Sequence, residues 1–220
     1  MKFSLKNKVA EPSLAAIRRL KSAGFEAYWV GGSVRDILLK RIPKDFDVAT
    51  SAPVAAISKL FPKHLKVGKK FGIVIFTEFQ YPVEIATFRK DLRYVDGRRP
   101  VGVQKASLEE DVLRRDFTVN GFLYDPIQKR ILDNVHGMED LKKKIIRTIG
   151  DPEKRFQEDH LRILRAIRFA VQLGFRIEKK TWSAICKNSK KIKRISAERI
   201  REELLKIFSS PAPDQGLELL

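Results

Sequence analysis

The chain has 220 residues, of which 43% are hydrophobic, so it is long enough to bury a core in one large domain or two small ones and is not of disordered composition. Its 45 lysines and arginines outnumber 27 aspartates and glutamates, and the formal charge of +18 favours a polyanionic partner, with nucleic acid ahead of an anionic membrane. Cys186 is the only cysteine, which excludes an intrachain disulfide and a cysteine-based zinc site.

Neither a signal-peptide core nor an apolar run of the roughly 20 residues needed to span a bilayer is present in the sequence. We therefore expect a cytoplasmic protein. A basic surface on a soluble protein without a nucleic-acid partner is the plainer explanation of the charge, and composition alone leaves it open.

Residues 1–146 predict a mixed α and β domain. Apolar periodicity predicts helices over 12–23, 34–40 and 53–61 and a further helix over 107–124. Aromatic and β-branched runs predict strands over 25–30, 46–49, 71–79 and 83–88, the last two forming a hairpin, and a strand and a helical turn follow over 131–146. The basic segment 89–105 has no periodicity and is predicted to be a mobile loop.

Residues 147–220 predict a second, helical domain. The helical patterns run over 153–208, and residues 141–220 hold 20 basic and 10 acidic side chains. The chain stops at Gly216–Leu220, an apolar helical start without a stop signal, which predicts that this is a fragment of a longer protein.

Asp45 and Asp47 flank Phe46 in a predicted strand. Alternate side chains of a strand share a face, so the two Cα atoms would lie roughly 6–7 Å apart with both carboxylates on one side. Carboxylate oxygens are ligands that Mg²⁺ prefers. Most such pairs are surface or turn acids, so this pattern alone is weak.

A glycine turn, Gly31-Gly32, precedes the acidic pair and is followed by Ser33 and Arg35. Glycines let the backbone approach a ligand, and a hydroxyl and a guanidinium there suit a phosphate. An ordinary strand–turn–helix with a capping serine explains the turn equally well. Together, a phosphate cradle and a metal site are the minimum equipment for phosphoryl transfer.

These residues resemble the class II branch of the DNA polymerase β-like nucleotidyltransferases, the family of bacterial poly(A) polymerases and tRNA CCA-adding enzymes with their separate A-adding and CC-adding forms. The similarity spans roughly residues 25–210 with its motifs in order. The similar segments are Gly31–Asp36, Lys44–Thr50, Glu84–Arg89, Arg114–Asn120, Asp125–Leu141 at scattered positions, Glu158–Phe169 and Ser196–Leu204.

The resemblance implies an α+β fold, with a polymerase β-like head of a mixed sheet and flanking helices over 1–146 and an all-α neck over 147–220. It implies that Asp45 and Asp47 bind two Mg²⁺ ions and that Glu84 is the third acidic residue of the catalytic site. For Glu84, an outward-facing strand position is the alternative.

The resemblance also implies a set of nucleotide-binding residues. Asp116 and Asn120, four apart, would share a helical face and bind ribose hydroxyls, although Asp116 as a helix cap is the alternative. Asp159 and Arg162 would pair on a helix and select the base, against the alternative of a surface ion pair. The remaining members of the implied set are Gly31, Gly32, Ser33, Arg35, Arg115, Arg165 and Arg168.

The implied activity is template-independent transfer of AMP, with CMP left open, from ATP or CTP to an RNA 3′ end. The substrate RNA, tRNA or mRNA, is left open, as is the choice between poly(A) polymerase, A-adding and CCA-adding specificity. A catalytically silent RNA-binding module is the alternative of a different class.

Overall fold

The computed structural model describes residues 8–65, 72–78, 81–94, 97 and 100–220. The described residues form two compact units. Unit 1 comprises the described residues up to Asp91 together with Gly102–Arg114 and Asn120–Asn134, and unit 2 comprises Leu92–Val101, Arg115–Val119 and Val135–Leu220. No described helix is long and apolar enough to cross a membrane.

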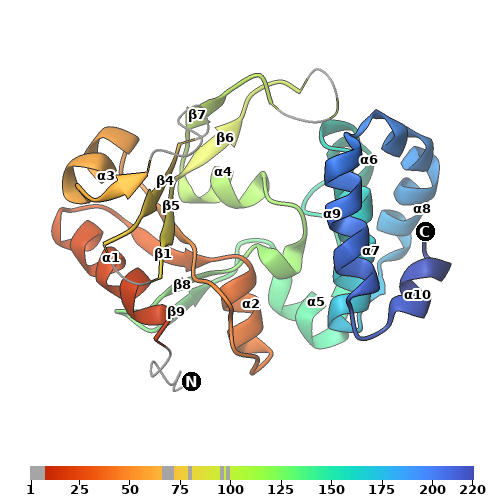
Figure 1. Ribbon diagram of the computed structural model, residues 1–220, viewed down its shortest axis with the longest axis horizontal. Coiled ribbons are helices and arrows are strands. Elements are labelled where there is room, and N and C mark those ends of the chain that lie inside the picture. The colour runs from red at the N-terminus through yellow and green to blue at the C-terminus, as the bar shows by residue number, and fades with distance from the viewer. Residues whose placement is uncertain (1–7, 66–71, 79–80, 95–96, 98–99) are drawn as a thin grey trace. The chain divides into compact units, whose positions relative to one another are not determined.

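Unit 1 is an α+β structure, as the sequence predicts. In chain order its elements are α1 Ala10–Ser22, β1 Ala27–Val30, α2 Gly32–Leu38, β2 Val48–Thr50, α3 Val54–Leu60, β3 His64–Leu65, β4 Ile73–Phe76, β5 Val83–Thr87, β6 Arg89–Asp91, β7 Val103–Lys105, α4 Leu108–Leu113, β8 Leu123–Asp125 and β9 Arg130–Leu132 (Figure 1).

The main sheet of unit 1 has seven strands in the order β3-β4-β5-β2-β1-β8-β9. Its strands pair antiparallel except β2 and β5, which run parallel. Helix α1 packs against β1 and β2, and α3 packs against β4. The predicted hairpin of β4 and β5 is confirmed, with Val74 opposite Ile85.

Trp29 of β1 anchors the core of unit 1. Its side chain is 1% exposed, and its indole Nε1 donates to the Ser13 hydroxyl of α1 at 2.8 Å. The Phe46 ring packs tilted against it and the Tyr124 ring stacks on it, with ring centroids at 4.7 and 5.8 Å. Burying these rings removes a large apolar area from water and fixes the segment that carries Phe46 against the sheet.

The described part of unit 2 is mainly helical and contains two short parallel strands. Its elements are α5 Gly137–Lys143, β10 Ile145–Ile146, α6 Pro152–Glu158, α7 Leu161–Leu173, β11 Arg176–Ile177, α8 Lys179–Asn188, the 3₁₀ helix η3 Ser189–Arg194, α9 Ala197–Phe208 and α10 Pro213–Glu218. Packing places residues 135–146 in this unit, and the proposed domain boundary at residue 146 stays a prediction.

Two predicted elements differ from the structure. The segment 89–105 is not one irregular loop, because its ends pair as the antiparallel strands β6 and β7, with Arg89 opposite Lys105. The helix predicted over 107–124 ends at Leu113, and a 3₁₀ turn at Thr118–Asn120 and strand β8 follow it. The Ser107 capping box fixes the start of α4, whereas nothing in the local pattern marks its early end.

Candidate functional site

Asp45 and Asp47 lie just before β2 and not within a strand as predicted, since β2 begins at Val48. The segment nevertheless continues the sheet, because the Val30 N–H donates to the Asp47 carbonyl oxygen at 3.2 Å. Phe46 points inward onto Trp29, and both aspartate side chains are exposed. The alternation expected of a strand is therefore retained.

Glu84 lies on β5, the parallel neighbour of β2. The register pairs Val48 with Ile85, so Asp47 and Glu84 are each one residue before a paired position. Registered residues of neighbouring strands point to the same face, which places both carboxylates on one side of the sheet. We call Asp45, Asp47 and Glu84 the acidic edge.

The pKa of Glu84 is raised above its usual value, first because surrounding atoms exclude water from the carboxyl group and also because Asp45 is nearby; Arg89 opposes the shift. Asp45 contributes to this shift because two ionised carboxylates close to one another repel. The outward-facing alternative for Glu84 is correct in that its side chain reaches solvent, and the register shows that it does so beside Asp47.

The acidic edge carries carboxylate oxygens, which are ligands that Mg²⁺ prefers. No group of three or more His, Cys, Asp or Glu side chains in the described part of the chain is placed so that it could hold a metal ion, so a complete set of protein ligands is not present there. Mg²⁺ does not require one, because it is usually bound through one or two carboxylates with water and substrate phosphates completing the shell. The exposed carboxylates of Asp45 and Asp47 fit that mode.

A buried aspartate next to the acidic edge escaped the sequence analysis. Asp111 of α4 is 1% exposed, and its Oδ1 accepts from the Arg89 backbone N–H at 3.2 Å and from Arg114 Nη2 at 2.7 Å. Arg114 also donates to the Arg89 carbonyl oxygen at 3.0 Å. These bonds fix the start of β6 and hence the arginine that faces Glu84. A capping-box helix preceding Arg114 was the only sequence signal.

The glycine turn connects β1 to α2. Gly31 has φ +68°, which favours glycine, and its N–H donates to the Phe122 carbonyl oxygen at 3.1 Å. Ser33 donates its hydroxyl to the Val30 carbonyl oxygen at 3.0 Å, so its proton is engaged inside the turn; the capping serine of the alternative is not found, because α2 begins after Gly31 without a side-chain cap. Arg35 is buried and donates to Asn120 Oδ1 at 2.6 Å and to Asp36.

Asp116 and Asn120 do not share a helical face, which corrects the prediction for this pair. The residues between α4 and β8 are not α-helical, and the two side chains belong to different units. Asn120 accepts from Arg35 in unit 1, while Asp116 Oδ2 accepts from Arg165 Nε at 2.9 Å in unit 2. Arg115 lies beside Asp116, and its carbonyl oxygen accepts from Arg155.

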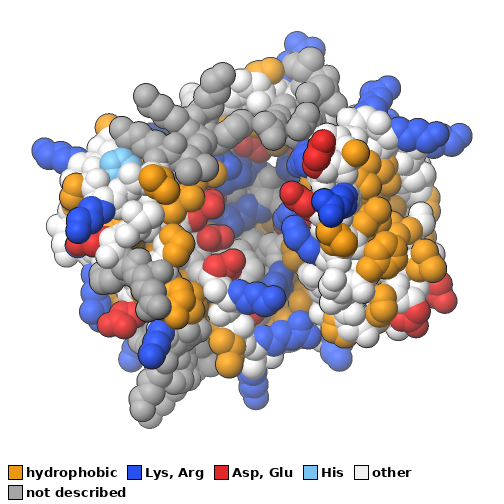
Figure 2. All heavy atoms as spheres, viewed as in Figure 1, with side chains coloured by type: hydrophobic (Ala, Val, Ile, Leu, Met, Phe, Trp, Pro, Cys, Tyr) orange, Lys and Arg blue, Asp and Glu red, His pale blue; other side chains and the backbone are white. Residues whose placement is uncertain are grey.

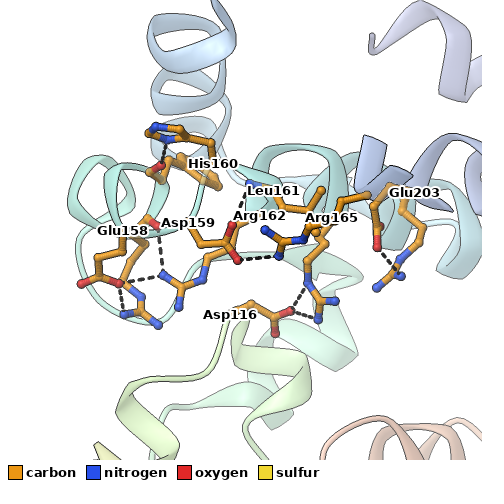
Figure 3. Close-up of polar contacts among 12 residues, drawn as sticks. Asp116, Glu158, Asp159, His160, Leu161, Arg162, Arg165 and Glu203 are labelled. Atoms are coloured by element: carbon orange, nitrogen blue, oxygen red, sulfur yellow. Dashed lines mark hydrogen bonds and ion pairs between the residues drawn. The ribbon is translucent and has the colours of Figure 1, made fainter. Parts of the chain in front are cut away.

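Asp159 and Arg162 are not an ion pair on one helix, which corrects a second prediction. Asp159 ends α6 in an extended conformation, and α7 begins only at Leu161. Its Oδ1 accepts from the Leu161 N–H at 3.1 Å, and its Oδ2 accepts from Arg199 at 3.3 Å (Figure 3). Arg162 instead donates to Glu158 at 2.7 Å and to the Arg155 carbonyl oxygen at 2.9 Å.

The arginines of α7 are each held by an acid from another part of unit 2. Arg168 Nη1 donates to Glu203 of α9 at 3.0 Å, and Arg168 Cζ lies 4.3 Å from the Phe169 ring centroid. Arg165 bonds to Asp116, whose charge and hydrogen bonds outweigh burial and raise the pKa of Arg165. We call these contacts the arginine network; it comprises Arg155, Arg162, Arg165, Arg168 and Arg199 with Asp116, Glu158, Asp159 and Glu203.

His160 is buried at the start of α7, and its Nδ1 lies 2.7 Å from the Phe156 carbonyl oxygen. Its N–H donates to the Gly97 carbonyl oxygen at 2.9 Å, and a Cβ on Gly97 would lie 2.2 Å from His160 Nε2. The sequence analysis did not anticipate this contact between Gly97 and the residue after Asp159. A glycine inside an aperiodic segment was its only signal.

Comparison with known proteins decides the family. Residues 27–147 match the model of the poly(A) polymerase head domain. The chain belongs to this family. Residues 174–220 match a second model, described as a probable RNA and SrmB-binding site of polymerase A. Both matches agree with the resemblance expected from the motifs.

The chain is similar to full-length proteins named CCA-adding enzyme. It is 46% identical to that of Lactobacillus helveticus over 94% of this chain and 52% of the relative, and 44% identical to that of Geobacillus kaustophilus over 96% of this chain and 52% of the relative. The chain thus spans about half the length of the curated relatives it matches.

Solved structures show the same fold. The Bacillus stearothermophilus CCA-adding enzyme in complex with CTP superposes with a TM-score of 0.89 at 40% identity, covering 97% of this chain and 52% of that one. The Thermotoga maritima CCA-adding enzyme complexed with tRNA superposes with a TM-score of 0.80 at 26% identity, covering 97% and 50%. The expected polymerase β-like head is confirmed.

Proposed function

We propose that the protein is a template-independent RNA nucleotidyltransferase that adds CMP and AMP from CTP and ATP to the 3′ end of tRNA. The acidic edge of unit 1 carries this proposal. Exposed Asp45, Asp47 and Glu84 at one edge of a sheet, in a member of the poly(A) polymerase head family, suit a metal-dependent phosphoryl transfer.

Asp45 and Asp47 would hold Mg²⁺, and Glu84 would contribute a third carboxylate beside them. When bound, the metal neutralises charge on the triphosphate and lowers the pKa of the attacking 3′-hydroxyl. The buried ring of Phe46 holds the two aspartates at a fixed spacing, so the carboxylates need little reorganisation when substrate arrives.

The backbone of Gly31 and Gly32 and the guanidinium of Arg35 would contact the triphosphate in unit 1. Asn120 would bind a ribose hydroxyl and also fixes Arg35 through the 2.6 Å hydrogen bond. Because phosphates and ribose are common to all ribonucleotides, these contacts select the class of nucleotide and not its base.

Asp159 and Arg162 would select the base in unit 2. A carboxylate accepts from an exocyclic amine, and a guanidinium donates to a ring nitrogen or carbonyl oxygen. ATP and CTP both present an amine beside an acceptor, whereas GTP and UTP present a carbonyl there. Asp116, Arg115, Arg165 and Arg168 complete the proposed nucleotide-binding set, with Arg165 and Arg168 oriented by Asp116 and Glu203.

The names of the relatives favour CCA addition over poly(A) synthesis. A catalytically silent RNA-binding module remains the competing function, and the intact acidic edge argues against it. Cytoplasmic location stays a prediction.

One assay separates these functions. The purified protein is given Mg²⁺ and labelled CTP or ATP with tRNA ending before CCA, tRNA ending after CC, or an unrelated RNA. CMP on the first and AMP on the second identify CCA addition. Long adenylate tracts on unrelated RNA identify a poly(A) polymerase, and binding without transfer identifies the silent module.

A further inference from the structure

The 3₁₀ helix η3, Ser189–Arg194, is the most basic short element of unit 2. Four of its six residues are cations, Lys190, Lys191, Lys193 and Arg194, and Lys187 precedes it on α8. Lysine and arginine side chains project at several places on the face of the molecule that Figure 2 shows. The side chains of Lys190, Lys193 and Arg194 are exposed.

The backbone of η3 is fixed by apolar contacts with α7. Ile192 packs against a buried cluster of Leu161, Leu164 and Ile195. Leu161 and Leu164 alternate along α7 with Arg162 and Arg165, so the cations of η3 are carried by an element that packs directly on the proposed base-selecting helix. The backbone of η3 is packed while its charges are exposed, whereas a solvated tail would have no packed backbone.

The charge arrangement of η3 is unfavourable for the isolated protein. In a 3₁₀ helix, residues i and i+3 eclipse one another about 6 Å apart along the axis. Lys190 is thereby aligned with Lys193, and Lys191 with Arg194. Like charges at such spacing repel, and a polyanion placed over them would remove that cost.

Acidic partners do not offset this repulsion. Lys187 is paired with Glu153 at 2.7 Å, and Lys191 donates to Asn188 Oδ1 at 2.8 Å. By contrast, none of Lys190, Lys193 and Arg194 forms a side-chain ion pair or hydrogen bond with the part of the chain that the structure describes. Their charges are available to an external ligand.

We propose that η3 is a docking site for the phosphate backbone of the RNA substrate, with Lys190, Lys193 and Arg194 as its contacts. This inference rests on the proposed function only for the identity of the RNA. No aromatic side chain lies within η3 on which a base could stack, so the contact is made to phosphates and is independent of sequence. It assigns specific residues within the segment that matches the RNA-binding model.

The test measures affinity for fluorescein-labelled tRNA lacking CCA as a function of salt, by fluorescence anisotropy with the whole protein. The variant is Lys190→Ala/Lys193→Ala/Arg194→Ala. The matched control is Lys142→Ala/Lys179→Ala/Lys180→Ala, which removes the same charge from exposed lysines of the same unit. Thermal melting by circular dichroism checks both folds, and the η3 variant is expected to melt no lower than the wild type.

We expect the η3 variant to reduce the slope of log K against log [salt] by about 2–3, with affinity at 50 mM salt lowered more than tenfold, because each phosphate contact contributes about 0.7–1 to the slope. The control should change the slope by less than 1. An η3 slope equal to that of the control overturns the proposal, because total charge then explains binding. Since this is a binding measurement, loss of nucleotide transfer in the wild type would count against the proposed function alone.

Discussion

The charged groups of the acidic edge in unit 1 are exposed, whereas those of the arginine network in unit 2 are paired with one another. The carboxylates of Asp45 and Asp47 are exposed at the end of a sheet whose buried rings fix the backbone. Arg162 and Arg168 of α7 are buried and Arg165 is half-buried, and each is held by an acid from another segment. The proposed metal and triphosphate ligands need to be accessible, whereas the proposed base-selecting residues need donors and acceptors held in one orientation.

This difference predicts where a substitution damages chemistry and where it damages the fold. Removing an exposed ligand should abolish activity and leave stability unchanged. Removing one member of a buried pair should lower stability before it affects activity, because the remaining charge loses its partner.

The largest effect is expected at the acidic edge. Asp45→Ala or Asp47→Ala should lower kcat for nucleotide transfer by about 10³-fold or more, because a bound metal supplies several kcal/mol of transition-state stabilisation. Single-turnover assays with labelled ATP and tRNA measure this, with melting curves as the check on folding. Glu202→Ala, which removes an exposed acid of α9, is the control. Activity within tenfold of wild type in both variants would remove the acidic edge as the catalytic site.

The next effect contrasts a buried and an exposed ion pair of unit 2. Glu203→Ala should lower the free energy of unfolding by about 3–5 kcal/mol, because it leaves the buried Arg168 guanidinium without its acid. Glu153→Ala breaks the exposed pair with Lys187 and should cost about 0–1 kcal/mol. Urea titrations compare the two. Equal costs would mean that the Glu203 pair is not desolvated in solution.

Base selection should respond to Asp159→Ala/Arg162→Ala. Loss of hydrogen bonds to the base costs about 1–3 kcal/mol, so the preference for ATP over GTP should fall by roughly one to two decades. The ratio of kcat/KM values is the measured quantity, because Arg162 also pairs with Glu158 and the double variant loses stability. Arg35→Ala is the comparison and should lower kcat/KM for all four nucleotides alike. A full ATP preference at a reduced rate would make Asp159 and Arg162 structural residues.

The smallest effect concerns the pH dependence of stability. The pKa of Glu84 is raised in the folded protein. As the pH rises above the pKa that Glu84 has in the unfolded chain, the Glu84 carboxyl group of the unfolded chain loses its proton first. Stability therefore decreases until the carboxyl group of the folded protein also ionises, and it is constant at higher pH. Glu84→Gln removes this penalty and should melt higher than the wild type at pH 7, with the difference vanishing near pH 3. A lower melting temperature at pH 7 would contradict the raised pKa of Glu84.

Much of the fold and the family followed from local sequence patterns. Alternation around Phe46, the apolar runs of β4 and β5 and the positive-φ turn at Gly31 have short-range causes, and each gave a prediction that the structure or the family match supports. The predicted length of the helix from residue 107 and the predicted loop over 89–105 were wrong, because pairing between distant segments, as in β6 with β7, decided these structures.

The sequence by itself determined the family, and the resemblance predicts which charged residues belong to the candidate site. Only the tertiary structure decided which partner each of them takes. Asp116 pairs with Arg165, 49 positions away, and Asp159 with Arg199, 40 positions away, instead of with the neighbours that helical spacing suggested. An ion pair depends on distance in space, and a chain with 45 basic residues offers every acid many equivalent partners until packing brings one of them within reach.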